Sequence, residues 1–171
     1  MTLHFDKNVH QALDKIEFFD YHEIIVHEKE EERTHLNSCQ IIETYGKAKW
    51  QIVDLLNQQY NTKFDLYNWL NKDKSDEVAY FLNESGSNCL NYSEFKSPTK
   101  FHLWLGKNGF IIGIEQNGKG FNAEEVYQKK IKENEGNGFQ FFANCKSKVF
   151  FNNSNDAKIV FFKHNFQINN Y

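Results

Sequence analysis

"GIEQNGKGFNAEEV", from Gly113 to Val126, is the stretch that decides the fold of this sequence. An apolar run ends in two glycines that one residue separates, Gly118 and Gly120, and a helical pattern starts after Asn122, a residue suited to capping a helix. Glycines in such a place either form a tight turn or let the backbone approach a ligand closely. The sequence on both sides of this stretch indicates whether it is a turn or a binding loop.

The elements around this stretch predict a layered domain. Upstream, the apolar runs "FHLWL" and "FIIGIEQ" flank the turn "GKNG" and predict a hairpin. Downstream, "NAEEVYQKKIKEN" predicts a helix, "GNGFQFFANCK" predicts a glycine turn that opens another helix, and "KVFFNN" with "AKIVFFKHNF" predicts a last hairpin. Each element has one apolar face to bury, so we predict an α+β two-layer sandwich, with a mixed, largely antiparallel sheet covered by helices on one face.

Helices are also predicted upstream of the hairpin. Apolar positions recur at steps of three and four over residues 37–60 and predict a long amphipathic helix, which serves either core packing or a helix–helix interface, including a dimer surface; they are Ile41, Tyr45, Ala48, Ile52 and Leu55. A short helix is predicted at 64–70. A third begins after Ser75, the predicted N-cap, and its apolar face is Val78, Ala79, Leu82, Gly86, Cys89 and Leu90. On another face it carries Glu84 and Asn88 as neighbours, four residues apart.

Length and composition favour a single domain over residues 1–171. The chain is 40% hydrophobic and contains one proline, in the predicted turn "KSPTK", so no linker rich in proline and glycine divides it. Within the domain we distinguish a helical part at 36–71 and a core at 72–165. The segment 1–35 is undecided: it adds an edge strand or a helix to the domain, or serves as a docking arm. In it, "YHEIIVHE" is a candidate strand, and the charge run His27–Arg33 is typical of a solvated turn or helix start.

The same composition excludes several classes of protein. The net charge of −3 argues against a protein that holds nucleic acid by its phosphates. No apolar run approaches the roughly 18 residues of a membrane span, so we expect a soluble, cytoplasmic protein. The three cysteines form no CxxC pair and the seven histidines no HExxH motif, so neither residue type predicts a metal site.

With these motifs in view, residues 75–163 resemble the ATP-binding domain shared by histidine kinases, gyrase-type ATPases, Hsp90 and MutL, and most closely its bacterial anti-sigma-factor serine kinase branch. In that family a helix carries E-x-x-x-N, a hairpin follows, its second strand ends in D-x-G-x-G-F, and a later G-x-G-(L/F) opens a helix. The matching segments are "ESGSN" (84–88), "QNGKGF" (116–121) and "GNGF" (136–139). The resemblance implies that Mg²⁺ and ATP are bound by Asn88, Gln116, Gly118, Gly120, Phe121, Gly136, Asn137, Gly138 and Phe139, with Asn88 as the Mg²⁺ ligand and Glu84 as the catalytic acid/base.

Each part also makes physical sense. The amide oxygen of Asn88 suits Mg²⁺, a hard ion that prefers oxygen ligands. Glu84, one turn earlier, could polarise an attacking water or a substrate hydroxyl. Gly118 and Gly120 let the backbone approach base and ribose, whereas the second glycine pair leaves amide N–H groups free at a helix start, where phosphate is favoured. The short connection "VYQKKIKENE" lies where the family has its ATP lid. Its lysines either reach phosphate or form a solvated helix end.

Gln116 is the main departure from the family pattern. It stands where the family has an aspartate that accepts a hydrogen bond from the adenine amino group. The glutamine oxygen can accept the same bond, but the side chain is neutral, one methylene longer, and also carries an NH₂ group. Glu115 cannot substitute, because strand alternation points it to the opposite face of the sheet.

Three hypotheses follow. The first is an ATP-binding regulatory protein that resembles the anti-sigma-factor serine/threonine kinases, phosphorylates a regulatory protein partner and takes part in partner switching. The second is a binding or scaffold module that keeps the fold and has lost the nucleotide, as Gln116 suggests. The third is an unrelated two-layer domain whose glycines form turns only.

Overall fold

The computed structural model describes residues 2–27, 38–71 and 73–167 of the chain. In this part the strands form one six-stranded sheet in the order β1-β5-β6-β4-β3-β2. All neighbours pair antiparallel except β1 and β5, which are parallel, so the predicted mixed, largely antiparallel sheet is confirmed. The strands are β1 (Leu3–His4), β2 (Phe18–Val26), β3 (Phe95–Gly106), β4 (Gly109–Asn117), β5 (Lys148–Phe151) and β6 (Ile159–Asn165).

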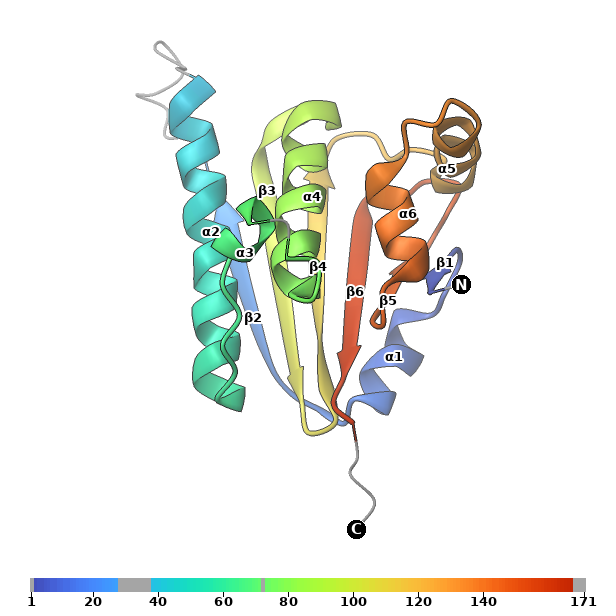
Figure 1. Cartoon of the computed structure of the whole chain (residues 1–171). Coiled ribbons are helices and arrows are strands. Elements are labelled where there is room, and N and C mark those ends of the chain that lie inside the picture. Colours follow the sequence, from blue (N-terminus) through green and yellow to red (C-terminus); the bar gives the residue numbers. More distant parts are fainter. Residues whose placement is uncertain (1, 28–37, 72, 168–171) are drawn as a thin grey trace.

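Helices α2, α4 and α6 lie over one face of this sheet, and α5 lies beside α6 (Figure 1). Alternate strand residues such as Ile112 and Phe162 point into the core beneath these helices, together with Ile52 and Leu82. The α+β sandwich is therefore confirmed. The helices are α1 (Val9–Lys15), α2 (Ser38–Tyr60), α3 (Tyr67–Leu70), α4 (Glu77–Tyr92), α5 (Ala123–Lys132) and α6 (Asn137–Asn144). No helix in the described ranges combines the length and apolarity needed to cross a membrane.

The N-terminal segment is part of the domain. It supplies β1 and β2, which close opposite edges of the sheet, and between them α1 packs on the face away from the other helices. There Ala12 and Ile16 form a second small core with Ile111, Phe150 and Phe161. Of the alternatives for residues 1–35, a strand and a helix are both realised. The charge run His27–Arg33 lies outside the described residues except for His27.

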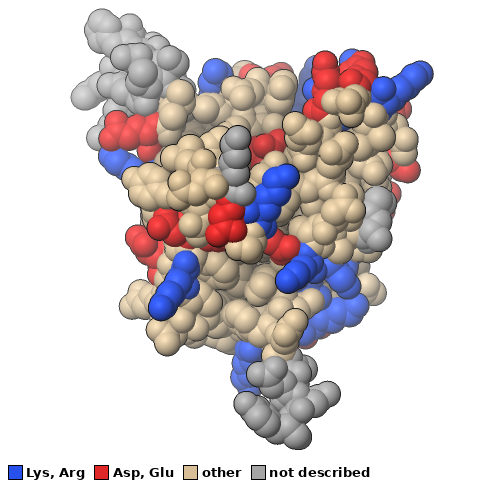
Figure 2. Space-filling view, viewed as in Figure 1, with Lys and Arg blue, Asp and Glu red and all other residues tan. Residues whose placement is uncertain are grey.

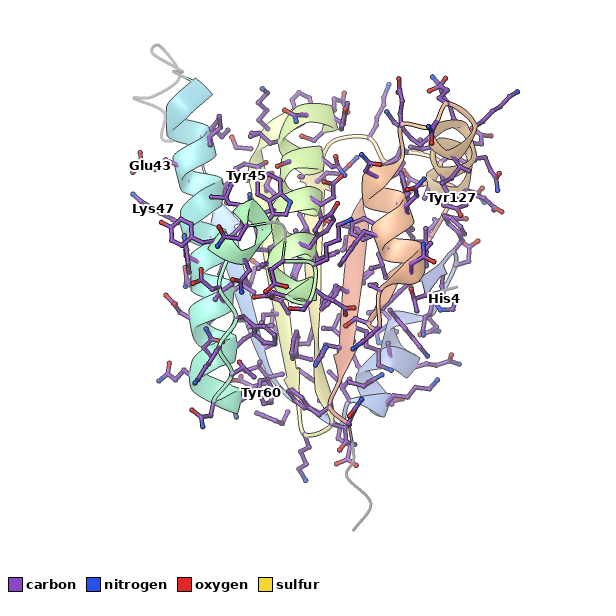
Figure 3. The ribbon with its side chains drawn as sticks, viewed as in Figure 1. His4, Glu43, Tyr45, Lys47, Tyr60 and Tyr127 are labelled. Carbon is purple, nitrogen blue, oxygen red and sulfur yellow. The ribbon has the colours of Figure 1, made fainter. Side chains whose placement is uncertain are left out.

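The long helix α2 is a core helix. The apolar positions that predicted it are buried at Ile41, Tyr45, Ala48 and Ile52 and half-buried at Leu55. The Tyr45 hydroxyl donates to the carbonyl of Lys96 in β3 at 2.7 Å, and the Tyr60 hydroxyl donates to that of Gly106 at 2.8 Å, so α2 is tied to one strand both in its first half and at its last residue (Figure 3). Because this stripe is buried in the chain's own core, it is not the dimer surface that the sequence suggested.

Two local predictions were wrong. The N-cap of α4 is Asp76 and not Ser75: one carboxylate oxygen of Asp76 accepts from the amide of Ala79 at 2.9 Å, and the other accepts from the amide of Asp65 at 2.9 Å. A carboxylate has two separate oxygens, so one can cap the helix while the other bonds the amide of Asp65, whereas a serine side chain has a single oxygen. The segment "KSPTK" is not a turn but part of β3, where pairing with β4 is interrupted between Phe95 and Lys100. Pro98 falls in that interruption, where no ladder N–H is required.

Candidate functional site

A pocket of about 660 Å³ lies among α4, α6, the end of β4 and the loop that follows it. Its volume is that of an ordinary small-molecule site. Every site residue expected from the sequence except Gly118 and Asn137 lines it: these are Glu84, Asn88, Gln116, Gly120, Phe121, Gly136, Gly138 and Phe139. Ile114, Phe142 and Val160 add apolar surface. The fold therefore brings together three motifs that lie far apart in the sequence.

The α4 side of the pocket carries the carboxylate and the amide. The Asn88 side-chain NH₂ donates to Glu84 Oε1 across one helical turn, at 3.4 Å. Its amide oxygen accepts no hydrogen bond from any described residue. Burial raises the pKa of Glu84, and the bond from Asn88 opposes this shift. A raised pKa makes this carboxylate a stronger base than an exposed glutamate, which suits a group that accepts a proton.

The second glycine pair is fitted closely to Glu84. Gly136 is the N-cap residue of α6 and, lacking a side chain, makes no side-chain capping bond to the first amides of the helix. Gly138 is buried, and a Cβ there would collide with the Glu84 carboxylate. The pair thus leaves the helix start open to an anion, as expected from the sequence, and also makes room for the catalytic candidate. Asn137 is exposed and lies outside the pocket lining.

Gln116 is held in a defined orientation at the end of β4. Its side-chain NH₂ donates to the carbonyl of Lys119 at 2.6 Å, and its backbone N–H donates to the carbonyl of Lys158 at 2.9 Å. A carbonyl can only accept, so the amide nitrogen must face Lys119, and the side-chain oxygen is left as the acceptor. The neighbouring Glu115 points to the other face of the sheet, where it meets His102, as strand alternation predicted.

The first glycine pair serves the loop's own packing. Gly118 has φ +93°, and a Cβ there would meet the side chain of Glu94; at Gly120 it would meet Asp156 and the carbonyl of Ala157. Glu94 also accepts a hydrogen bond from the Lys119 amide at 2.6 Å. The sequence suggested that these glycines let the backbone approach the base and ribose of a nucleotide. In the structure, the atoms that approach the two glycines closely belong to the protein itself. Only Gly120 of the pair lines the pocket.

The charged residues around the pocket were only partly expected. Of the lysines in "VYQKKIKENE", Lys130 alone lines the pocket, and its ammonium lies 3.6 Å from a carboxylate oxygen of Glu135. Lys119, Lys158 and Glu94 also line it and were missed. No periodicity marks them, since each belongs to a strand end or loop that only the tertiary fold brings to the pocket. In the part of the chain that is described, no three histidine, cysteine or acidic side chains gather as a metal site. A cation in the pocket would therefore be held by Asn88 and Glu84 together with ligands that do not come from protein side chains.

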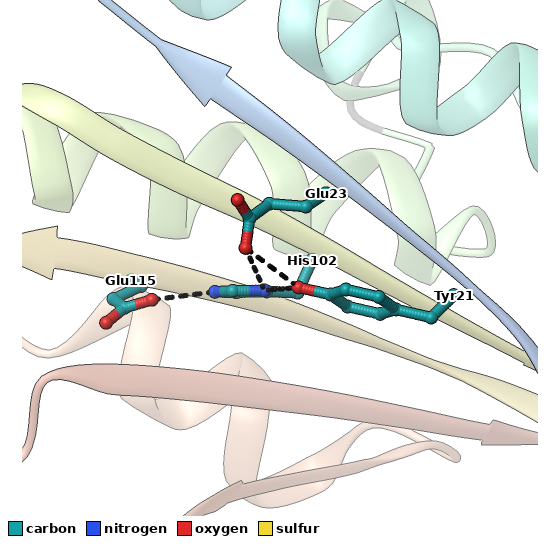
Figure 4. Close-up of polar contacts among 4 residues, drawn as sticks. All are labelled: Tyr21, Glu23, His102 and Glu115. Atoms are coloured by element: carbon teal, nitrogen blue, oxygen red, sulfur yellow. Dashed lines mark hydrogen bonds and ion pairs between the residues drawn. The ribbon is translucent and has the colours of Figure 1, made fainter.

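A second polar cluster lies on the opposite face of the sheet (Figure 4). His102 Nε2 donates to Glu115 Oε2 at 2.8 Å, and His102 Nδ1 lies 2.6 Å from the Tyr21 hydroxyl, which also bonds Glu23 at 3.1 Å. Burial and the bond to Glu23 raise the pKa of Tyr21 to about 12, so the phenol stays protonated. The ring of Trp104 stacks on His102. This cluster ties β2, β3 and β4 together and fixes which face Glu115 and Gln116 occupy.

The chain matches no family model, no curated protein and no solved structure. Its function is therefore inferred from the geometry of the pocket and the order of the motifs.

Proposed function

We propose that this protein binds Mg·ATP in the pocket between α4 and α6, and acts as a regulatory protein of the anti-sigma serine/threonine kinase type that switches between protein partners. One observation carries the proposal. The segments 84–88, 116–121 and 136–139, which together give the resemblance, contribute side chains or backbone to a single pocket of about 660 Å³. A fold that used these glycines only for turns would not require the three segments to meet.

The polar groups are distributed as a nucleotide needs them. The free oxygen of Gln116 is the acceptor for the amino group of adenine, beside the apolar surface of Ile114 and Val160. The uncapped start of α6 and Lys130 are the groups that favour phosphate. The amide oxygen of Asn88 fits a magnesium ion, which prefers oxygen ligands and keeps several waters. When bound, Mg²⁺ would neutralise phosphate charge.

Glu84 is the group that could handle a proton. In the proposed reaction its carboxylate would accept the proton of a serine or threonine hydroxyl on the partner protein as that oxygen attacks the terminal phosphorus of ATP; the bond from this phosphorus to the bridging oxygen would break, and ADP would leave. The desolvation that raises its pKa makes the carboxylate a stronger base. The proposal of phosphotransfer rests on the resemblance, and the proposal of a nucleotide site rests on the pocket.

Nucleotide binding is tested by thermal melting with and without Mg·ATP, in wild type and Asn88→Ala. A ligand at about 100 times its Kd stabilises by about 2.7 kcal/mol, which for a chain of this size raises Tm by roughly 5–10 °C. We expect that rise in wild type and its loss in Asn88→Ala. The matched control is Asn91→Ala, an exposed asparagine of the same helix outside the pocket, which should keep the full rise. Wild-type Tm unchanged at millimolar Mg·ATP would refute the proposal.

Gln116 favours a second candidate, a binding module that has lost the nucleotide. The substitution Gln116→Asp distinguishes the nucleotide-binding protein from the module that has lost the nucleotide, because it restores a charged acceptor at this position. If the native protein is a nucleotide binder, the variant should bind ATP about as tightly as wild type or up to tenfold more tightly. Calorimetric titration of both proteins with ATP measures this. Binding seen in the variant and absent from wild type would instead establish the nucleotide-free module.

A further inference from the structure

Four lysines converge on the face of the sheet opposite the pocket, around α1. Lys163 of β6 stands directly across from Lys148 of β5 in the antiparallel register. The ammonium of Lys7, just before α1, lies 5.5 Å from the ring centre of Phe150, the residue after Lys148. Lys15 is in the last turn of α1. Figure 2 views the other, helix-covered face of the sheet, where Lys and Arg side chains are interspersed with Asp and Glu.

These charges have no acidic counterpart. No ion pair within residues 2–27, 38–71 and 73–167 includes any of the four lysines, and the ammonium of Lys163, a residue that is only 2% exposed, makes no hydrogen bond there. Burial, followed by the charges of Lys7, Lys148 and Lys15, lowers the pKa of Lys163 to about 8. Like charges paired across strands destabilise a sheet, and partial desolvation of an unpaired ammonium adds to that cost. The fold therefore carries an electrostatic strain that a bound anion would relieve.

A histidine borders the same cluster. His4 of β1 pairs in register with Phe150, and its Nε2 is buried without a hydrogen-bond partner in the described structure (Figure 3). Burial, Lys7 and Lys148 lower the pKa of His4, which favours the neutral ring. A neutral imidazole can still donate one N–H to an anion. An unsatisfied buried polar atom beside unpaired lysines is independent evidence that a ligand belongs there.

We propose that Lys7, Lys15, Lys148 and Lys163 form a binding site for a phosphate group, either inorganic phosphate or a small phosphate ester. Phosphate concentrates charge on several oxygens and can meet several ammonium groups at once, which a single carboxylate cannot do as well. Because Lys163 is buried, the anion must be compact enough to reach it. The overall charge of −3 disfavours a long polyanion such as nucleic acid. The site is separate from the proposed nucleotide pocket and does not depend on it.

The test is titration of the full chain with inorganic phosphate and, separately, with O-phosphoserine, at ionic strength held constant with chloride. We expect a saturable rise in Tm, and the ligand that binds more tightly identifies free phosphate or the ester as the source. In Lys163→Met the Kd should rise at least about tenfold, since one charge-assisted contact is lost. The exposed Lys47→Met on α2 is the matched control and should bind as wild type does.

A third variant excludes the nucleotide pocket as the place of binding. Lys130→Met removes the lysine that favours phosphate in the nucleotide pocket and should leave the Kd of the lysine site for phosphate unchanged. Loss of phosphate binding in Lys130→Met with retention in Lys163→Met would overturn the proposal, as would a wild-type Tm that responds to phosphate no more than to chloride. If Lys163→Met fails to fold, Lys7→Met, at a half-buried position, takes its place with the same expected loss.

Discussion

Glu84 is the residue at which stability and proposed function compete. Its carboxylate is half-buried against Gly138 in the pocket, and burial raises its pKa above the ordinary value of 4.5. A raised pKa means that the folded state binds the proton more tightly than the unfolded state. The contribution of Glu84 to stability is therefore most favourable at low pH and falls as pH rises through 4.5 toward the folded-state pKa. At neutral pH the buried charge costs free energy.

This predicts an unusual pair of effects for Glu84→Gln. The variant keeps the shape of the side chain and removes the buried charge, so its free energy of unfolding at pH 7 should exceed that of wild type. The difference should shrink as the pH approaches 4. Urea denaturation at both pH values measures it. The same variant should bind nucleotide and lose any phosphotransfer; equal stability of the two proteins at pH 7 would contradict the burial argument.

At the residue scale the sequence predicted part of the pocket lining. Glu84, Asn88 and Gln116, which line the pocket, were singled out because they fall in short motifs whose order resembles that of an ATP-binding family. Glu94 and Lys158 were not, because no local pattern announces a residue that reaches a pocket through a tertiary contact. The pairing of Lys148 with Lys163 was hidden for the same reason: it depends on the register of two strands.

At the scale of elements, α2 is fixed to the sheet by polar bonds as well as by apolar packing. The buried Tyr45 hydroxyl lies 2.7 Å from the Lys96 carbonyl and 2.6 Å from the Thr99 hydroxyl. These bonds hold the irregular start of β3, which the sequence had suggested to be a turn. We expect the helix to hold that segment in the sheet where Pro98 cannot contribute a ladder hydrogen bond.

Removing this hydroxyl should therefore weaken the domain. Tyr45→Phe keeps the ring, which packs edge-on against Phe101, and leaves a buried acceptor with one partner fewer. The expected loss is about 1–2 kcal/mol in the free energy of unfolding, measured by urea denaturation. Tyr67→Phe on α3, where the ring is 60% exposed, is the control and should change stability by less than about 0.5 kcal/mol. Equal effects in the two variants would show that the Tyr45 bonds contribute nothing.

The elements themselves were largely predictable. The helices over 37–60 and 75–92 and both hairpins follow from periodicity and glycine turns, since each buries one face against the same sheet. The first 26 residues resisted prediction because β1 is only two residues long and β2 is an edge strand with exposed Phe18, Phe19 and Tyr21, which weakens the alternation of apolar and polar positions. Their place in the sheet is decided by partners distant in sequence.

At the scale of the whole molecule, the sheet separates two candidate binding regions. The pocket among α4, α6 and the glycine loop lies on the face covered by helices, and the lysine site lies on the face that α1 covers in part. Strand β4 belongs to both faces: Gln116 points into the pocket, while Glu115 is held by His102 on the other side. Side-chain alternation along one strand thus gives each face its own chemistry.

Backbone NMR spectra during titration with Mg·ATP test the central claim most directly. The proposed function predicts saturable shifts of the amide signals of Gly120, Gly136 and Gly138, which border the pocket, and of the side-chain NH₂ of Gln116. The amide of Gly46, on α2 and away from the pocket, should not move. Spectra that stay unchanged at millimolar Mg·ATP, or shifts that spare all three pocket glycines, would contradict a nucleotide site in this cleft.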